Sequence, residues 1–153
     1  MDIELTETGN GGDLVKRPKD LSVISGLGNM PYLAMFGGNL EASTPVTRLE
    51  TEQAFDWWGN TLLFSDDPGL QLNSRTERAL LETALTSQGR LAVERAVLSD
   101  LAFMRPFANV SVQASITSTD TIRIAVRLQR PDNLEEREYI FIWDASKEEL
   151  SLK

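Results

Sequence analysis

The sequence predicts an α+β fold in which two helices pack on an antiparallel β-meander. Two neighbouring segments, 75–86 and 90–104, carry apolar residues at helical spacing. Segments 108–117 and 121–130 then alternate apolar and polar residues, which is typical of half-buried strands. The short polar stretch 117–120 between them is typical of a hairpin turn, so we expect the two strands to be antiparallel neighbours.

Local signals predict where each helix begins and ends. Ser74, with Glu77 three residues later, matches a capping box and predicts that the first helix begins at residue 75. Gly89 lowers the helix propensity between the two segments, so the second helix is expected only from residue 90. Arg105-Pro106 ends it, because the residue before a proline is disfavoured in the α region.

A third strand is predicted over 137–144. The run from Tyr139 to Trp143 is apolar on both faces, so it needs cover on both sides, from its own chain or from a partner. No lysine or proline interrupts any of the three strands, although isolated proteins use both to protect sheet edges. We therefore expect the meander to offer an open edge to which a neighbouring chain can add a strand.

The N-terminal half is predicted to be an irregular segment with short strands. Residues 2–6 alternate and predict a strand, and residues 9–13 predict a turn. The apolar run 32–36 fits a buried strand or one helical turn, and its periodicity does not separate the two. Residues 66–69 predict a further turn. No linker or repeat divides the chain, so residues 1–153 are expected to form a single domain.

The composition excludes several kinds of chemistry, because the chain has no cysteine and no histidine. The lack of cysteine excludes disulfide frameworks, zinc ribbons and cysteine nucleophiles. The lack of histidine excludes Ser-His-Asp triads and most transition-metal sites. The glycine-rich stretches 26–29 and 37–39 carry no nucleotide-binding fingerprint. We therefore expect no cofactor and no metal.

Charge is distributed unevenly along the chain. Residues 1–74 hold 11 acids and 4 bases, residues 75–130 hold 5 acids and 8 bases, and residues 131–153 hold 7 acids and 3 bases. All eight bases of the middle segment are arginines, whose planar guanidinium groups suit carboxylate partners. They pair either with acidic partners or with the chain's own surplus of carboxylates. The net charge of −8 argues against a nucleic-acid partner.

Neither membrane insertion nor secretion is predicted. No apolar run approaches the length of a membrane span, and the acidic N-terminus lacks the apolar region of a signal peptide. We expect the protein to be made in a cytoplasm and to have no membrane partner.

A glycosidase places two carboxylates across a cleft, and the acidic residues of the predicted helices do not provide such a pair. Glu77 is interpreted as the cap of its own helix. Glu82 and Glu94 each lie four residues after an arginine, at the spacing of a helical salt bridge. Asp100 has no such assignment, but one carboxylate does not form a dyad. We therefore expect no catalytic residues.

The adjacent tryptophans Trp57 and Trp58 interrupt a polar, acidic stretch. Neighbouring residues of a strand point to opposite faces, so one of the two rings is expected to meet a second surface. Tryptophan is enriched among interface anchors, which favours that role. The alternative is a loop that folds back so that both rings cover the sheet.

The order of short motifs along the chain resembles that of one protein family. The motifs are Asp2-Ile3-Glu4-Leu5, Gly11-Gly12-Asp13-Leu14, Asp56-Trp57-Trp58-Gly59-Asn60, Leu72-Asn73-Ser74-Arg75, a helical stretch ending near Met104, and a meander closing at Arg130-Pro131-Asp132. This order is similar to that of the small baseplate wedge family of contractile phage tails, in its Mu-like branch. The Glu-Pro-Arg triplet of the better-known branch is absent, and Arg105-Pro106 matches it only in part.

The resemblance implies a structural role, although the family is often labelled lysozyme-like. It implies a fold similar to the inner domain of the sheath subunit and six copies around the tail axis of a virion. The implied partners are the larger baseplate wedge subunits, the tail sheath protein and the central hub or spike. The first sheath ring would donate extended strands to this subunit.

We expect an interface that includes Trp57, Trp58, Asn60, Arg75, Arg105, Arg123, Arg127, Tyr139 and Trp143. Two other functions stay open at this point. One is a tail-associated peptidoglycan hydrolase, and the other is a free-standing ligand-binding α+β domain with a concave apolar pocket.

Overall fold

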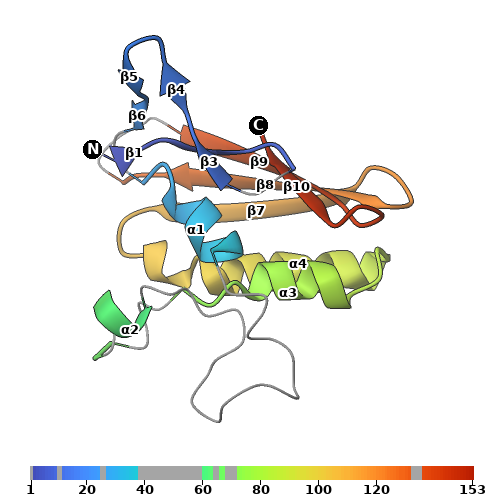
Figure 1. The fold of residues 1–153 in the computed structure, drawn as a ribbon. Helices are drawn as coiled ribbons and strands as arrows, with labels where there is room; N and C mark the ends of the chain where they lie inside the picture. The colour runs from blue at the N-terminus through green and yellow to red at the C-terminus, as the bar shows by residue number, and fades with distance from the viewer. Residues whose placement is uncertain are drawn as a thin grey trace.

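A four-stranded antiparallel sheet forms the centre of the computed structural model. The structure describes residues 2–9, 12–24, 27–37, 60–63, 66–67, 72–131 and 136–153. The sheet consists of β7 (Asn109–Ile116), β8 (Thr121–Gln129), β9 (Glu136–Asp144) and β10 (Glu149–Leu152), in the spatial order β10-β9-β8-β7. Helices α1 (Met30–Phe36), α3 (Arg75–Glu82) and α4 (Ser87–Asp100) lie on one face of it (Figure 1). The predicted α+β class is confirmed.

The predicted alternation of the strands decides which face meets the helices. On β8, Ile122 and Ile124 are fully buried, whereas Arg127 on the opposite face is exposed. Antiparallel pairing places Ile124 between Ala114 of β7 and Phe141 of β9. Residues that face one another across a sheet share a face, so these three side chains form one layer of the core.

The predicted three-stranded meander is corrected by a fourth strand. The chain reverses at Glu148, which has a positive φ of 55°, and β10 then pairs with β9. Leu150 lies opposite Trp143, and Leu152 lies opposite Phe141. The alternation of these two leucines was the only sequence signal for a strand of four residues. Strand β9 is therefore internal, and its apolar character on both faces does not mark an edge.

Helix α3 begins at Arg75 as predicted but ends at Glu82 rather than at residue 86, and α4 differs from the prediction at its start. Helix α4 begins at Ser87 rather than at residue 90, because Thr86 caps it by accepting a hydrogen bond from the Gly89 N–H at 3.1 Å. Gly89 belongs to the first turn of α4, where a Cβ would lie 2.0 Å from the carbonyl oxygen of Ala84. A short 3-10 helix, Ala102–Met104, follows α4. The glycine thus permits a close approach of the backbone and does not break the helix.

The prediction of a capping box at Ser74 is wrong. Ser74 has a φ of 44° and a ψ of 43°, and its side chain makes no capping hydrogen bond. Its hydroxyl oxygen is buried without a hydrogen-bond partner. The start of α3 is satisfied from another helix, as described below.

The apolar run 32–36 forms helix α1, which settles the alternative between strand and helix. Ala34 and Met35 of α1 are fully buried, and Pro31 lies in the first turn, where a proline costs no hydrogen bond. Helix α2 (Asn60–Leu63) is a single turn.

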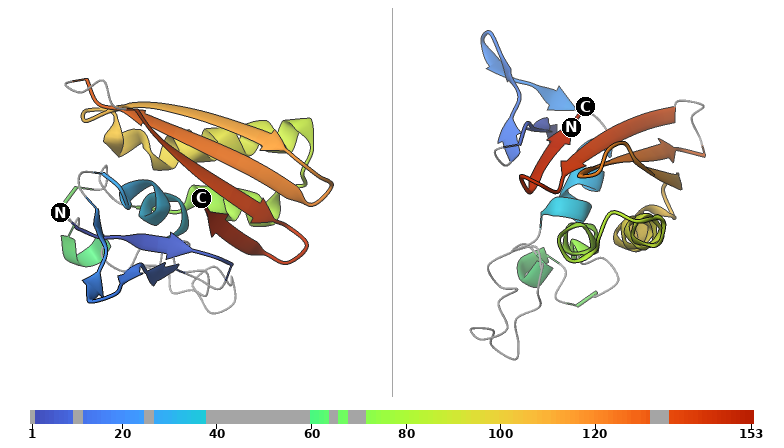
Figure 2. Two further views of the ribbon diagram at one scale, coloured as in Figure 1. Left: turned by 90° about the horizontal axis from the view of Figure 1, so that it is seen from above. Right: turned by 90° about the vertical axis from the view of Figure 1, so that its right-hand side faces the viewer.

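The N-terminal segment consists of short paired strands, as predicted in outline. These are β1 (Asp2–Ile3), β2 (Leu5–Glu7), β3 (Gly12–Leu14), β4 (Lys16–Arg17), β5 (Asp20–Leu21) and β6 (Val23–Ile24). Strand β2 pairs with β3, β4 with β5, and β1 with β6. A bridge between Thr8 and Ser151 connects the β2–β3 hairpin to the outer side of β10. Both views in Figure 2 place this segment on the β10 side of the molecule, away from β7.

The hydrophobic core lies between the sheet and the helices. Met35 of α1, Leu80 of α3 and Val93 of α4 meet the sheet there. The ring centroids of Phe36 and Phe141 are 5.4 Å apart, which is within the range of a favourable aromatic pair.

Candidate functional site

The two edges of the main sheet differ in what lies beside them. The edge formed by β10 is joined to the N-terminal segment through the bridge between Thr8 and Ser151. Strand β7 forms the other edge, and no strand of the described part of the chain pairs with its outer side. The predicted open edge is therefore β7.

One position of the β7 edge is occupied by side chains of α4. The Ala114 N–H donates a hydrogen bond of 2.8 Å to Glu94 Oε1, and the Ala114 carbonyl accepts one of 3.4 Å from Arg90 Nη1. Arg90 and Glu94 also pair with each other at 2.7 Å. A strand added along β7 would have to displace this pair at Ala114.

The rest of the β7 edge has main-chain N–H and C=O groups that the β7–β8 ladder does not use. The N–H and C=O groups of Ala114 point away from β8. Along an antiparallel strand, the N–H and C=O groups of successive residues point alternately toward a given neighbouring strand and away from it. The N–H and C=O groups of Val110 and Val112 therefore also point away from β8. The usable edge comprises residues Asn109 to Gln113, and it carries neither lysine nor proline.

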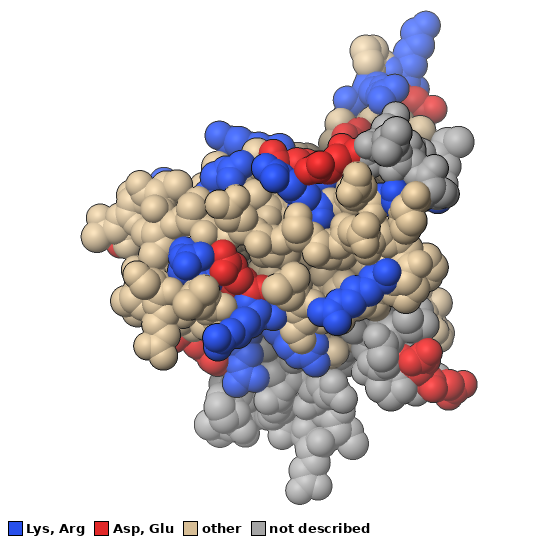
Figure 3. All heavy atoms as spheres, turned by 180° about the vertical axis from the view of Figure 1, so that it is seen from behind, with Lys and Arg blue, Asp and Glu red and all other residues tan. Residues whose placement is uncertain are grey.

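Exposed apolar side chains occur on α4 and just before β7. Phe107, just before β7, is 57% exposed, and Leu91 and Leu98 on the outer face of α4 are 42% and 37% exposed. Arg95 on α4 and Arg105, which follows the 3-10 helix, are exposed as well. Figure 3 views the molecule from the α4 and β7 side and shows basic side chains spread over a largely uncharged surface. The surface thus combines apolar and cationic groups next to unused main-chain groups.

The arginines of β8 lie on the opposite face of the sheet from the helices, as predicted. Arg127 pairs with Glu138 at 2.9 Å and with Glu136 at 3.4 Å, and these bonds raise its pKa. Arg123 is half-buried on the same face. For Arg127, the alternative that arginines pair with the chain's own carboxylates is confirmed.

Two predicted interface residues of β9 lie instead on the inner face of the sheet. Trp143 is only 5% exposed, and Tyr139 is half-buried. The alternation of β9 puts both on the side of Phe141, which faces the helices. The indole N–H of Trp143 and the hydroxyl of Tyr139 are buried without hydrogen-bond partners.

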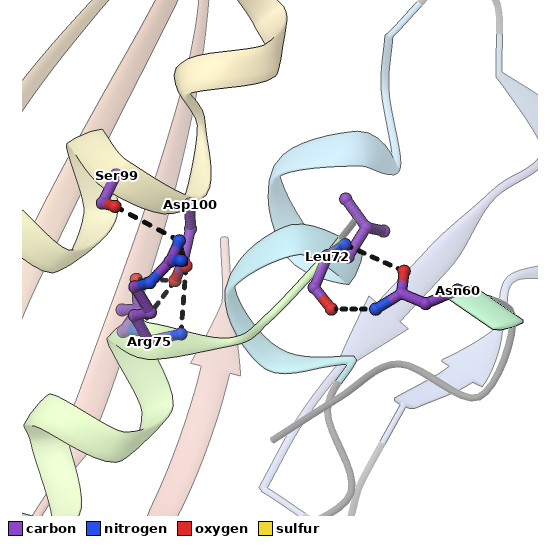
Figure 4. A network of polar contacts seen from close by, with 6 residues as sticks. Asn60, Leu72, Arg75, Ser99 and Asp100 are labelled. Carbon is purple, nitrogen blue, oxygen red and sulfur yellow. Dashed lines mark hydrogen bonds and ion pairs between the residues drawn. The ribbon is translucent and has the colours of Figure 1, made fainter. Parts of the chain in front are cut away.

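Asn60, another predicted interface residue, is 1% exposed and binds its own chain. Its side-chain amide donates to the Leu72 carbonyl at 2.8 Å and accepts from the Leu72 N–H at 2.9 Å (Figure 4). These reciprocal bonds hold α2 against the segment that leads into α3. The side-chain amide of Asn60 is therefore used within its own chain.

Asp100 caps the start of α3 from the end of α4. Its carboxylate accepts the N–H groups of Arg75 at 3.0 Å and of Thr76 at 2.7 Å, and the Thr76 hydroxyl at 2.8 Å. The Arg75 guanidinium lies 3.8 Å from the same carboxylate and 3.2 Å from Ser99 Oγ (Figure 4). Burial raises the pKa of Asp100, against these hydrogen bonds and the Arg75 charge, which lower it.

Sequence reasoning missed this cap. The only indication of the cap in the sequence was that Asp100, unlike the other acids of the two main helices, had no assigned partner. Arg75, a predicted interface residue, contributes both its backbone N–H and its side chain to the contact.

Two of the remaining helical acids behave as predicted. Glu82 pairs with Arg78 at 3.1 Å, and Glu94 pairs with Arg90. Glu77 does not cap its helix: its Oε2 atom is buried without a hydrogen-bond partner, and burial raises its pKa to about 8. The interpretation of Glu77 as a cap is therefore wrong.

The tryptophans Trp57 and Trp58 and the turn residues Pro68 and Gly69 lie outside the described residues. Among the described residues, no group of three or more Asp and Glu side chains is arranged to hold a metal ion. No helix in the described ranges has the length and apolarity needed to cross a membrane.

Comparisons with protein-family models, with curated proteins and with solved structures find no match to this chain.

Proposed function

We propose that this protein is a structural subunit of a contractile-tail baseplate, which joins the wedge core to the first sheath ring. The observation that carries this proposal is the open, regular β7 edge over Asn109 to Gln113. Such an edge accepts a strand through main-chain hydrogen bonds, while alternate side chains give specificity. The motif order that resembles the small baseplate wedge family supplies the biological setting.

The size of the open edge determines how tightly a strand can bind. Val110 and Val112 offer two N–H and two C=O groups, and each hydrogen bond contributes about 0.5–1.5 kcal/mol net. Four such bonds alone provide only weak binding once the cost of ordering a chain is subtracted. Side-chain contacts must add to them, and Phe107 lies at the start of the same edge.

The proposed partners are the tail sheath protein at β7, and the larger wedge subunits and central hub elsewhere on the surface. Six copies around the tail axis would place six β7 edges in a ring. In this assembly the acceptor is preformed, so the donor segment alone pays the ordering cost.

Hydrogen exchange of the free and the assembled protein tests the strand addition. We expect the amides of Val110 and Val112 to gain protection on assembly, because their N–H groups become hydrogen-bonded. The amide of Ala114 is already bonded to Glu94 and serves as an internal control that gains little. The absence of added protection anywhere on β7 would show that the sheath binds through loops or helices instead.

One observation favours the second candidate, a peptidoglycan hydrolase. A buried carboxyl with a pKa of about 8 is protonated at neutral pH, which is the state that a general acid needs. Turbidity of a peptidoglycan suspension with the purified protein distinguishes the two functions. The structural proposal expects no clearing by the wild type, whereas clearing that is lost in Glu77→Gln would replace it.

A further inference from the structure

A second feature lies on the other side of the molecule from β7, in the groove between α3 and the β9–β10 hairpin. Two adjoining cavities of about 380 Å³ and 270 Å³ share Leu81, Trp143 and Glu148 in their walls. The larger one reaches the β2–β3 hairpin and α1, and the smaller one reaches the turn between β7 and β8. Together they form a continuous groove along α3.

The groove is strongly acidic. Its described lining includes Glu7, Glu77, Glu82, Asp120, Glu148 and Glu149, and no lysine or arginine. Glu7 accepts hydrogen bonds from the Tyr32 hydroxyl at 3.0 Å and the Gly9 N–H at 2.8 Å, which hold its carboxylate in place. Glu82 pairs with Arg78 and Glu77 is protonated at neutral pH, which leaves Glu7, Asp120, Glu148 and Glu149 as the main carboxylates of the groove.

The floor of the groove is apolar, with two polar groups that lack partners. Trp143 lines both cavities, and Leu81 is 40% exposed beside it. The indole N–H of Trp143, a residue that is 5% exposed, has no hydrogen-bond partner, and neither has Glu77 Oε2. Unpaired buried polar groups are costly, and both residues line the larger cavity, so a ligand that reaches these atoms would supply the missing hydrogen bonds.

We propose that this groove binds a basic segment of a partner chain, which inserts lysine or arginine side chains among the carboxylates and apolar side chains against Trp143 and Leu81. Charge complementarity selects this occupant: a cation gains from the carboxylates and from the faces of Tyr32 and Trp143. The residues involved are separate from those of the β7 edge, so this inference does not rest on strand addition. Figure 2 shows α3 with β10 and α4 with β7 on opposite sides, so both surfaces can be used at once.

Fluorescence anisotropy with a labelled peptide of alternating Lys and Leu, about ten residues long, tests the proposal. A Glu–Leu peptide of the same length is the charge-reversed probe. The double variant Glu148→Gln/Glu149→Gln neutralises the groove, and Glu136→Gln/Glu138→Gln removes the same charge from the outer face of the sheet. We expect the Kd of the Lys–Leu peptide to rise about tenfold in the groove variant and to change less than about twofold in the control.

Nuclear magnetic resonance locates the peptide within the molecule. We expect the indole N–H resonance that is missing in Trp143→Phe to shift during the Lys–Leu titration. Three results would overturn the proposal: equal weakening by both charge variants, equal binding of the Glu–Leu peptide, or no shift of the Trp143 resonance. A dimer of this chain that is lost in the groove variant, without peptide binding, would instead identify a second copy as the occupant.

Discussion

At the scale of single residues, the cap of α3 is decided by contacts from outside the helix. Ser74 has the side chain that an N-cap needs, but its backbone is left-handed and its hydroxyl makes no capping hydrogen bond. Asp100 replaces it with a carboxylate that accepts three hydrogen bonds. A local motif predicts a helix start correctly here, although a different residue provides the hydrogen bonds.

Substitution of Asp100 should therefore destabilise the protein, whereas substitution of Ser74 should not. We expect Asp100→Ala to lower the free energy of unfolding by about 2–3 kcal/mol, because it leaves two backbone N–H groups without an acceptor. Ser74→Ala should be neutral or slightly stabilising, because the buried Ser74 hydroxyl has no partner. Urea unfolding of both variants measures this. A larger loss of stability in Ser74→Ala than in Asp100→Ala would show that Ser74 caps α3 after all.

Glu77 should make stability depend on pH. Its folded-state pKa of about 8 lies above its ordinary value of 4.5, so the folded protein holds one extra proton between these values. Stability from this group is thus complete below about pH 4.5 and is lost as pH rises through 8. Between pH 5 and pH 8 the loss should be about 3 kcal/mol.

Glu77→Gln should remove this slope, since glutamine does not titrate. Glu82→Gln, on the same helix but exposed and paired with Arg78, is the control and should keep it. Chemical unfolding of the three proteins at several pH values gives the comparison. Identical slopes in the wild type and Glu77→Gln would mean that Glu77 is ionised in the folded protein.

At the scale of elements, α4 both covers the sheet and limits its edge. Val93 and Val97 face the core, while Arg90 and Glu94 reach the main chain of β7 at Ala114. The salt bridge between these two residues was predicted from their spacing. Its second role was not predictable, because the contact joins residues that lie 20 positions apart.

Loss of Glu94 should open the edge at Ala114. We expect Glu94→Ala to speed the hydrogen exchange of the Ala114 amide by about tenfold or more, because it removes a charged acceptor worth about 1.5–3 kcal/mol. Glu82→Ala removes a helical salt bridge that does not touch β7, and it should leave this amide unchanged. Unchanged exchange in Glu94→Ala would show that Glu94 does not protect the edge.

At the scale of the whole molecule, the open edge and the acidic groove are formed by different residues: the edge belongs to β7, and the groove is lined mainly by α3, the β9–β10 hairpin and the β2–β3 hairpin. A subunit that joins two partners needs two such separate surfaces. The uneven charge of the sequence is reflected in the groove only in part: the arginine-rich middle segment forms α3, α4, β7 and β8 and supplies three of the six acidic side chains in the described lining, while the N- and C-terminal segments supply the other three, Glu7, Glu148 and Glu149.

The tryptophan pair can be assigned by measuring stability and binding together. If Trp57 or Trp58 is an interface anchor, its replacement by alanine should weaken partner binding by about 2 kcal/mol or more and leave the melting temperature nearly unchanged. If both rings belong to the core, either replacement should cost about 3–5 kcal/mol of stability. Thermal unfolding and pull-down of each variant distinguish the two.

The sequence by itself determined the α+β class, the helices α3 and α4, the three long strands and the face that each strand buries. These features depend on periodicity and on short-range turn and salt-bridge signals, which are local properties of a chain. They also located Arg123 and Arg127 on the outer face of the sheet.

Only the tertiary structure decided which edge is open, which residue caps α3 and where Asn60, Tyr139, Trp143 and Glu77 lie. Each of these depends on segments far apart in the sequence: β10 pairs beside β9, Asp100 reaches α3 from α4, and the groove joins five separate parts of the chain. A hydrogen bond or a desolvated carboxyl depends on which groups become neighbours, and that is settled by packing rather than by local sequence.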